Sequence, residues 1–562
     1  MKKLLYGGNV VNVFTDQIEK VNILIEDEKI IGVGDYTSAD ADITEDITGK
    51  YVCPGFIDGH IHIESTMLVP SELAKLCMPC GTTSIVADPH EIANVCGTDG
   101  IRYMMEASRG LPLNVYFTLS SCVPATPFDE AGAVLGAEDI RPLYSSKQVV
   151  GLAEMMNYPG VIFGDKEVHA KIKDALEMGK TIDGHAPFVT GKDLDKYVSA
   201  GVESDHECSG IEEALEKLGK GMKIMIRQGT AARNLVDLLP LFDEPYSRRC
   251  LLATDDRHPA DFMEEGQIDN IVRLAVKHGK SAITAIRMAT IQAAEHFGLR
   301  HVGAVAPGYR ADLIVLGDLD TVTIEDVYSR GNKVVDGGQV QAFASPVISS
   351  ELNEKVRNSF HLKEINQNDF HIEEKSEKCR VIEVIPGQLI TKEKICKINW
   401  EQNNGIDINA DILKLAVIER HKNTGHIGLG FIHGIGMQKG AMASSVSHDS
   451  HNIIVIGTND ADMAIAANHI RKHGGNVVVC SGKILSEMSL PVAGLMTDKS
   501  GEEIARDNVA VRNAVYDLGV CKQIEPFMNM AFVSLPVIPS IKMTTQGLVD
   551  VDKFERVSIY CD

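Results

Sequence analysis

The stretch Cys53-Pro54-Gly55-Phe56-Ile57-Asp58-Gly59-His60-Ile61-His62-Ile63-Glu64 decides how the rest of the chain is interpreted. Apolar and polar residues largely alternate from Phe56 to Ile63, which is typical of a β-strand. Successive side chains of a strand point to opposite faces, so His60 and His62 leave on the same side. Two neighbouring imidazoles form a chelating pair for a divalent metal. Two exposed strand histidines are the alternative, and residues further along the chain decide between them.

The chain is long and acidic. Its 562 residues are too many for one ordinary domain, and 44% of them are hydrophobic, enough for large cores. The 55 Lys and Arg against 78 Asp and Glu give a formal net charge of -23, which predicts no nucleic acid or membrane partner. There is no apolar N-terminal segment, no apolar run of transmembrane length and no disulfide-like cysteine spacing. These features predict a soluble cytoplasmic protein.

Strands and helical stretches alternate through the first two thirds of the chain, which is the pattern of a parallel sheet. Eight strands close a (β/α)8 barrel, whose reactive groups sit at the C-terminal ends of the strands. The predicted fold class is α/β, a TIM-like (β/α)8 barrel with a flanking composite β-sandwich and an additional C-terminal α/β domain. The expected strands cover residues 51–63, 82–88, 115–121, 149–154, 181–185, 201–206, 223–228 and 250–255. Helices are expected at 71–75, 99–108, 166–178, 210–218, 231–239 and 268–277.

Five segments make up the predicted domain organisation. Short strands at 1–50 and 301–345 pair into one β-sandwich, which flanks a metal-dependent barrel over 51–300. A polar, charged linker at 346–379 leads to a C-terminal α/β domain at 380–562, expected to cap or flank the active site.

Polar residues follow the C-terminal ends of most barrel strands. Four imidazoles and two carboxylates among them are more than one metal ion needs, and they suit two. A carboxylate from the fourth strand can bridge a pair of ions. The strand-1 histidines and the strand-8 aspartate can hold one ion, and the single histidines of strands 5 and 6 the other. The six candidate metal ligands are His60, His62, Glu154, His185, His206 and Asp255.

This ligand set predicts a hydrolytic chemistry. Two cations about 3.5–4 Å apart share a water molecule, lower its pKa toward neutrality and generate a bridging hydroxide. Mixed imidazole and carboxylate ligands fit zinc, iron(II) and manganese(II), and the residues do not choose among them. Asp255, beside that hydroxide, is placed to take its proton and pass it to a leaving group.

The same motifs resemble those of the amidohydrolase superfamily. The strand-borne histidine pair after Pro54-Gly-Phe-Ile-Asp-Gly59, the later strand-end ligands and the Pro307-Gly-Tyr-Arg-Ala-Asp312-Leu turn are all similar to that superfamily. Many of its binuclear members bridge their metals with a carboxylated lysine on the fourth strand. This chain has Glu154 at that position instead, which restricts the resemblance to members of the superfamily without the lysine.

From end to end the chain resembles the bacterial-type adenine deaminases. The resemblance implies hydrolytic deamination of adenine to hypoxanthine and ammonia in purine salvage, with two divalent metal ions. Manganese is the metal expected first, with iron(II) or zinc as alternatives, and a homodimer or higher homo-oligomer is expected. The matching motifs are Asp88-Pro-His90-Glu91-Ile-Ala-Asn94, Glu154-Met-Met-Asn157, Asp183-Gly-His185-Ala-Pro187, Asp205-His206-Glu207, Asp255-Asp256-Arg257 and Ser447-His448-Asp449-Ser450-His451-Asn452.

Under this resemblance a purine ring nitrogen must be protonated during the attack, and a nearby acid should supply the proton. Glu91 and Asp256 are the candidates, with Glu64 a weaker one; spacing does not choose among them. Together with Asp255, Glu91 and Asp256 form the predicted catalytic set.

Two further groups have open roles. Asp88 and His90 follow strand 2, where they could orient the metal-binding histidines, bind the purine, hold an extra ion or only cap the strand. His448, Asp449 and His451 crowd a serine-rich turn. That turn either satisfies its own backbone or folds over the barrel mouth and excludes water.

Two other interpretations remain open. One is another binuclear hydrolase of the same fold acting on a cyclic amide, of the dihydroorotase or hydantoinase type. Glu154 in place of lysine and the extra terminal domain argue against it. The other is a non-catalytic scaffold, and such proteins tend to lose ligands whereas all six are present here.

Overall fold

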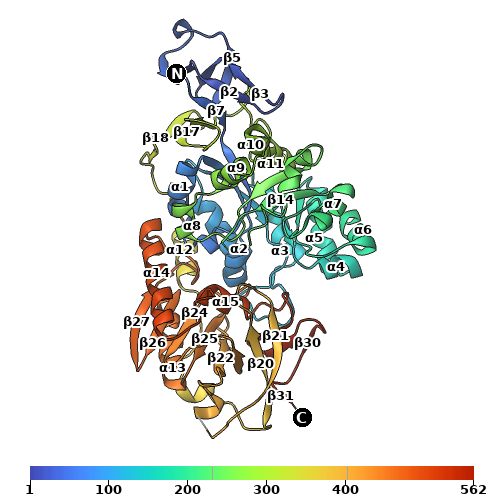
Figure 1. The fold of residues 1–562 in the computed structure, drawn as a ribbon, viewed down its shortest axis with the longest axis vertical. Coiled ribbons are helices and arrows are strands. Elements are labelled where there is room, and N and C mark those ends of the chain that lie inside the picture. Colours follow the sequence, from blue (N-terminus) through green and yellow to red (C-terminus); the bar gives the residue numbers. More distant parts are fainter. Residues whose placement is uncertain (231, 402, 562) are drawn as a thin grey trace. The chain divides into compact units, whose positions relative to one another are not determined.

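A computed structural model describes every residue of the chain except 231, 402 and 562 (Figure 1). The described residues form two compact units. The first comprises Met1–Pro89, Met104–Ser121 and Gly136–Ile348. The second comprises His90–Tyr103, Cys122–Leu135 and Ser349–Asp562. The second unit therefore takes two pieces from the segment expected to form the barrel, while the predicted domain boundaries stay predictions.

Eight parallel strands in the described part of the first unit form a barrel. They are β8 (Phe56–Ile61), β9 (Thr82–Ala87), β10 (Asn114–Leu119), β11 (Val149–Met155), β12 (Thr181–Gly184), β13 (Ser204–Asp205), β14 (Lys223–Arg227) and β15 (Cys250–Ala253). One sheet runs in the order β12-β11-β10-β9-β8 and another in the order β13-β14-β15. The two sheets meet on both sides, because the Glu203 N–H donates to Ile182 O over 3.0 Å and Ile61 forms a parallel bridge to Asp255. The predicted (β/α)8 fold class is confirmed.

The barrel strands are covered on both faces. Every residue of β8, β9 and β11 is buried, as expected where helices lie outside a parallel sheet and side chains fill its inside. Figure 1 shows α5, α6 and α7 outside the strands. The helices of this region are α1 (Pro70–Cys77), α3 (Ala137–Ile140), α4 (Tyr158–Phe163), α5 (Lys166–Glu177), α6 (Gly191–Ser199), α7 (Ile211–Gly219), α8 (Pro259–Glu264), α9 (Ile268–Lys277), α10 (Ala282–Met288) and α11 (Ile291–His296).

Three local predictions need correction. The helix expected at 99–108 is the second half of α2 (His90–Ala107), which is broken at Gly97 with a φ of 62°. The expected helix at 231–239 is wrong in its described part, because an antiparallel bridge between Gln228 and Arg233 folds the chain back there. Residue 231 lies outside the described residues. The strand expected at 201–206 is reduced to β13.

Strands from both ends of the first unit pair beside the barrel. The expected strand at 51–63 is two strands, and β7 (Tyr51–Pro54) pairs with β2 (Asn9–Asn12) and β16 (Leu313–Leu316). One sheet has the order β19-β18-β17-β16-β7-β2-β3 and the other β5-β4-β1-β6. The remaining strands are β1 (Lys2–Tyr6), β3 (Gln17–Lys20), β4 (Asn22–Glu26), β5 (Lys29–Gly34), β6 (Ile43–Asp46), β17 (Ile324–Ser329), β18 (Asn332–Asp336) and β19 (Gln339–Val340).

The second unit is built on one large sheet with the order β21-β20-β23-β22-β25-β24-β26-β27, to which β31 adds at β20. Helix α13 (Asp460–His473) packs on β24, β25 and β26, and α14 (Gly501–Asp517) packs on β27. The expected linker contains α12 (Ser350–Arg357). The strands are β20 (Lys378–Val384), β21 (Thr391–Lys397), β22 (Leu413–Ile418), β23 (Ile427–His433), β24 (Ala441–Ser444), β25 (Ile453–Gly457), β26 (Asn476–Cys480), β27 (Lys483–Met488) and β31 (Tyr560–Cys561).

A small sheet, β28 (Ile541–Thr544), β29 (Gly547–Asp550) and β30 (Glu555–Arg556), and helix α15 (Pro526–Phe532) complete this unit. Among all the described residues, no helix is long and apolar enough to cross a membrane.

Gly184 at the end of β12 is predicted to be required for barrel closure. A Cβ built there would lie 2.1 Å from Ser204 O, a backbone atom of the neighbouring strand. Gly184→Ala should therefore lower the free energy of unfolding by about 1–3 kcal/mol, measured by chemical denaturation. Gly219→Ala at the end of α7, where outside its own helix no described atom lies within 4 Å of the new Cβ, should change it by no more than about 1 kcal/mol. Equal stability of the two variants would contradict the prediction.

Candidate metal centre

One group of side chains lies around the ends of β8 and β15. The Nε2 atoms of His60 and His62 are 3.1 Å apart. Asp255 Oδ1 lies 3.2 Å from Nε2 of His62 and 3.8 Å from that of His60. Glu154 Oε1, from the end of β11, lies 3.3 Å from Nε2 of His62. All four side chains are buried, so two imidazole nitrogens and two carboxylate oxygens face one small space.

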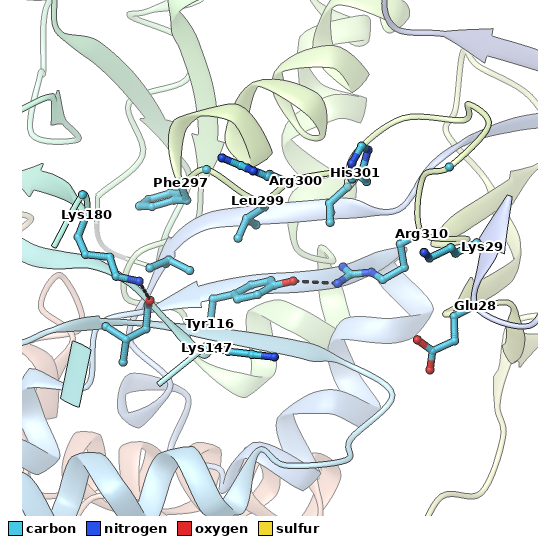
Figure 2. A pocket seen from close by; sticks show the side chains of 16 residues that line it. Glu28, Lys29, Tyr116, Lys147, Lys180, Phe297, Leu299, Arg300, His301 and Arg310 are labelled. Carbon is cyan, nitrogen blue, oxygen red and sulfur yellow. Dashed lines mark hydrogen bonds between the residues drawn. The ribbon is translucent and has the colours of Figure 1, made fainter. Parts of the chain in front are cut away.

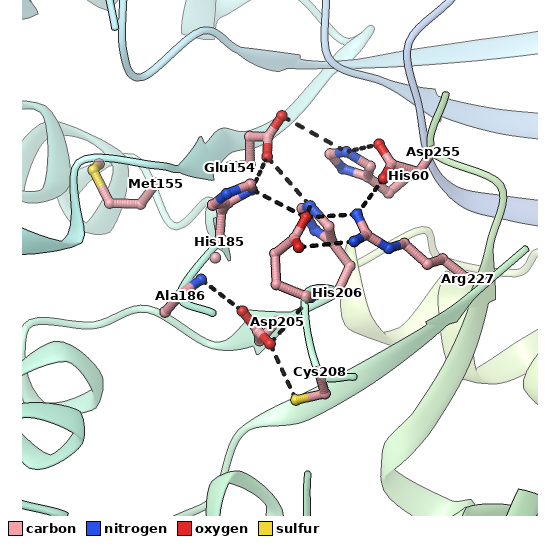
Figure 3. Close-up of polar contacts among 12 residues, drawn as sticks. His60, Glu154, Met155, His185, Ala186, Asp205, His206, Cys208, Arg227 and Asp255 are labelled. Carbon is pink, nitrogen blue, oxygen red and sulfur yellow. Dashed lines mark hydrogen bonds and ion pairs between the residues drawn. The ribbon is translucent and has the colours of Figure 1, made fainter. Parts of the chain in front are cut away.

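A second group lies around the ends of β12 and β13. The other Glu154 oxygen, Oε2, is 2.7 Å from His185 Nδ1 and 3.2 Å from His206 Nε2. Glu207 Oε1 lies 3.5 Å and 3.6 Å from the same two nitrogens. Figure 3 shows Glu154 between the two groups. Its carboxylate turns one oxygen to each group, which is the arrangement of a bridging ligand.

Hydrogen bonds on the far sides of the strand-1 imidazoles fix which nitrogen faces the centre. His60 Nδ1 lies 2.9 Å from Asp183 Oδ2, and His62 Nδ1 lies 3.1 Å from Asp88 O. Carboxylate and carbonyl oxygens only accept, so both Nδ1 atoms carry a proton and donate it. In neutral rings the two Nε2 lone pairs then face each other across 3.1 Å. Either an extra proton or a cation must lie between them, and the donor set fits a divalent metal ion.

The charges of the cluster are mutually dependent. Burial alone would raise the pKa of Glu154, but the neighbouring histidines, His185 first, hold that pKa well below its usual value. Burial would also raise the pKa of Asp255, but the neighbouring Arg227 guanidinium outweighs it and holds that pKa well below its usual value. Burial would lower the pKa of His206, yet the surrounding carboxylates raise it to about 10. Without a metal ion, His206 therefore holds a proton that a metal ion must displace.

Asp255 is held in a strained backbone conformation. Its φ is 61°, in the left-handed region, which costs a non-glycine residue roughly 1–2 kcal/mol. Its N–H donates to His60 O over 2.9 Å, and this contact between β8 and the end of β15 closes the barrel at the ligands. Such strain is commonly kept where it positions a functional side chain.

Three residues absent from the predicted site, Glu207, Arg227 and Asp183, complete the cluster. Arg227 at the end of β14 donates from Nη1 to Asp255 Oδ2 and to Glu207 Oε1, the latter over 2.5 Å, and from Nη2 to Glu207 Oε2 over 2.7 Å. It therefore fixes two carboxylates at once. Arg227 stands at the C-terminal end of a predicted strand, so the rule that found the other strand-end residues could have found it. The same rule could have found Asp183, because it precedes His185 by two residues on one predicted strand.

A buried ammonium group supports the second histidine group. Lys217 Nζ donates to Ala186 O over 2.7 Å, to Asp205 Oδ2 over 3.0 Å and to Glu213 Oε1 over 2.6 Å, which uses all three of its hydrogens. Asp205 Oδ1 in turn accepts from the Ala186 N–H over 2.8 Å. Ala186 and Asp205 each adjoin one of the predicted histidine ligands (Figure 3), so this network fixes the backbone on which those ligands stand.

Three other predicted residues lie in the first unit. Ser65 Oγ donates to Asp256 Oδ1 over 2.5 Å, which joins the loops after β8 and β15. Glu64 is buried next to Ser65. At Asp88 the main-chain carbonyl oxygen orients His62. The catalytic and binding roles of Asp256, Glu64 and Asp88 stay predictions.

The remaining predicted residues gather in the second unit. His451 Nε2 lies 3.5 Å from Glu91 Oε2. His90 Nε2 and His448 Nδ1 lie 3.8 Å and 3.7 Å from Asp449 Oδ1. The start of α2 and the 447–452 turn therefore meet, although they are far apart in the chain.

By residue type, the group Glu91, His448 and His451 could hold an extra metal ion, but the tautomer of His451 argues against it. The Ser447 N–H donates to His451 Nδ1 over 3.2 Å. Burial keeps the pKa of His451 well below its usual value, so the neutral ring carries its proton on Nε2. That nitrogen lies 3.5 Å from Glu91 Oε2 and, while it carries the proton, has no lone pair to offer a metal ion. The turn thus both satisfies its own backbone and orients an imidazole toward a carboxylate.

Comparison with known sequences assigns a family to this arrangement. A model of the amidohydrolase family matches residues 51–334, and a model of the adenine deaminase C-terminal domain matches residues 388–555. The chain is 46% identical over 559 residues to the adenine deaminase of Desulfatibacillum aliphaticivorans, covering 99% of this chain and 97% of that protein. The chain belongs to the adenine deaminase family. The predicted family is confirmed.

Other members of the adenine deaminase family are similar to the same degree. Adenine deaminase 2 of Carboxydothermus hydrogenoformans is 45% identical over 558 residues, covering 99% of this chain and 96% of that protein. Among solved structures, the dihydropyrimidinase of Brevibacillus agri is 18% identical with a TM-score of 0.48, covering 60% of this chain and 96% of its own. The clustered strand-end ligands fall in the amidohydrolase match, and the 447–452 turn falls in the C-terminal domain match.

Asp183→Asn is predicted to weaken metal binding about 10–100-fold. The amide can turn its NH₂ group toward His60 Nδ1 and so removes the acceptor that fixes this imidazole with Nε2 facing the cluster. The metal that remains after dialysis against graded chelator concentrations measures the effect. Asp193→Asn, on an exposed position of α6, serves as the control and should retain metal as the unmodified protein does. Equal retention by both variants would contradict the role of Asp183.

Metal binding is predicted to release protons. His206 has a raised pKa of about 10 in the metal-free cluster and must lose its proton to bind through Nε2. Below that pKa the metal affinity should rise with pH, by about tenfold per unit for each proton displaced. Calorimetric titration of Mn²⁺ into metal-free protein at neutral pH, in two buffers of different protonation enthalpy, should give different observed enthalpies. Identical enthalpies would show that no proton leaves.

Proposed function

We propose that this protein hydrolyses adenine to hypoxanthine and ammonia with the help of two divalent metal ions. Manganese(II) is the metal expected first, with iron(II) or zinc as alternatives. The observation that supports this proposal best is the Glu154 carboxylate, which faces a histidine group with each of its oxygens. Similarity to adenine deaminases over nearly the whole chain supports the choice of substrate. The proposed metal ligands are His60, His62, Glu154, His185, His206 and Asp255.

Divalent cations bound there would supply Lewis acidity and lower the pKa of a water molecule toward neutrality. The chain's own groups then move the protons. Asp255 Oδ1 faces the histidine pair while Oδ2 is held by Arg227, and its low pKa keeps the carboxylate ionised. In the proposed reaction, oxygen from water bonds to C6 of the purine. Asp255 carries one proton to the exocyclic amine, the C6–N bond breaks and ammonia leaves.

The second proton of water must end on a ring nitrogen of the product, which calls for an acid. Glu91 and Asp256 are the proposed donors, with Glu64 as a further candidate. The 2.5 Å hydrogen bond from Ser65 supports Asp256 as a positioned group. Glu91 has His451 Nε2 3.5 Å from its Oε2 atom. General acid–base steps of this kind contribute roughly 10²–10⁴-fold to rate. A cytoplasmic location and a homo-oligomeric state remain predictions.

An ammonia-release assay on manganese-loaded protein tests the proposal. Adenine should give strong activity and adenosine little, because a ribose on the purine would crowd a closed pocket. Hydantoin and dihydroorotate should not be hydrolysed, which would exclude the cyclic-amide alternative. Glu154→Gln should abolish turnover and reduce metal retention because a neutral amide cannot bridge two cations. Glu264→Gln, on an exposed position of α8, is the matched control and should stay active. Hydrolysis of a cyclic amide without deamination of adenine would overturn the proposal.

A further inference from the structure

A cleft in the first unit lies at the opposite ends of the barrel strands from the histidine cluster. It has a volume of about 510 Å³, within the range of roughly 300–1,000 Å³ typical of small-molecule sites. Val149, the first residue of β11, lines it. Glu154 lies five residues further along the same strand, roughly 16 Å away at the usual rise per residue. The cleft is therefore separate from the candidate metal centre.

The cleft carries a charge opposite to that of the chain. Among the described lining residues five are Lys or Arg and only Glu28 is acidic, although the whole chain has 55 basic and 78 acidic residues. Figure 2 shows Arg300 and His301 on one side of the space and Lys147 on the other. A concave surface lined by one sign of charge focuses the electric field and concentrates ions of the opposite sign. The cleft therefore attracts anions on an otherwise acidic protein.

Most of these cations have no carboxylate partner. In the part of the chain that the structure describes, no carboxylate oxygen lies within 4.0 Å of the side-chain nitrogens of Lys29, Lys147, Lys180 or Arg300. Lys180 Nζ donates to Val149 O over 2.5 Å, and burial lowers the pKa of Lys180. A partly desolvated ammonium group without a counter-ion gains most from a bound anion.

One basic group of the cleft has a structural role instead. Arg310 Nε donates to Asp312 over 2.5 Å, and the other guanidinium nitrogens donate to Tyr116 OH over 2.8 Å and Ser84 Oγ over 3.0 Å. Arg310 thereby holds the Tyr116 ring in the wall of the cleft (Figure 2). Leu299, from the loop after α11, adds apolar surface, and Phe297 is buried beneath it. An aromatic ring such as that of Tyr116 is suited to stacking against a heterocyclic base.

We propose that this cleft binds a phosphorylated small molecule of the nucleotide class. Arg300 and Lys147 would contact the phosphate, because guanidinium and ammonium groups form charge-assisted hydrogen bonds to phosphate oxygens. Tyr116, which is only partly buried, would contact the base. Strands β11 and β12 begin at this cleft. Strand β11 carries Glu154 near its other end and β12 ends immediately before His185, so an occupied cleft would stabilise the strands that position these side chains.

Calorimetric titration of the metal-loaded, full-length protein with AMP, adenosine and inorganic phosphate tests the proposal. AMP should bind, and more tightly than either adenosine or phosphate, because only AMP offers both a phosphate and a base. Failure of AMP to bind would overturn the proposal. If adenosine bound as tightly as AMP, the basic side chains would not contact the phosphate and the proposal would be wrong. If inorganic phosphate bound as tightly as AMP, the base would contribute nothing and the ligand would not be a nucleotide.

The double variant Lys147→Glu/Arg300→Glu should weaken AMP binding at least about tenfold, since hydrogen bonds to charged groups contribute roughly 1.5–3 kcal/mol each. Lys166→Glu/Lys192→Glu makes the same change in charge at exposed positions of α5 and α6, and it should bind AMP as the unmodified protein does. Equal weakening in both double variants would indicate only a long-range charge effect and overturn the assignment. Deamination of adenine should persist in Lys147→Glu/Arg300→Glu, so this test is independent of the proposed function.

Discussion

The structure depends on one shared carboxylate. Glu154 is buried with an oxygen turned to each of two histidine groups, and a buried anion is costly unless positive charge compensates it. The raised pKa values of His62, His185 and His206 favour imidazolium groups that provide this charge in the metal-free cluster, and divalent cations could replace their protons. Barrel closure serves this requirement, because it brings the ends of separate strands to one place. The ligands could not meet on any single helix or strand.

The groups around the cluster limit how far each predicted ligand can rotate. Asp183 fixes the tautomer of His60, and Arg227 joins Asp255 to Glu207. Lys217 ties the backbone beside the second histidine group with all three of its hydrogens. These contacts matter because the side chains of a binding site must be held within about 0.5 Å of their productive positions. The buried polar residues of this barrel are therefore part of its chemistry as much as of its stability.

Much of this arrangement could be predicted from the sequence, because strand alternation and the parallel-barrel rule both act locally. His60 and His62 follow from a period of two, and Glu154 follows from its position at a strand end. Contacts made by long side chains across strands are harder to predict. The strand-end rule indicates the position of Arg227, but no short-range pattern predicts that its side chain contacts two carboxylates that follow other strands. The break of α2 at Gly97 and the fold-back at 228–233 also depend on tertiary contacts that outweigh local helical propensity.

The glutamate at the fourth strand has a consequence for how the metal centre is assembled. A carboxylated lysine exists only where dissolved carbon dioxide has reacted with the amine, and acid reverses that reaction. The proposed bridging group, Glu154, is an ordinary side chain of the sequence, so it needs no carbon dioxide after translation. Reloading of the emptied protein with metal should then proceed equally well in degassed solution and in bicarbonate buffer.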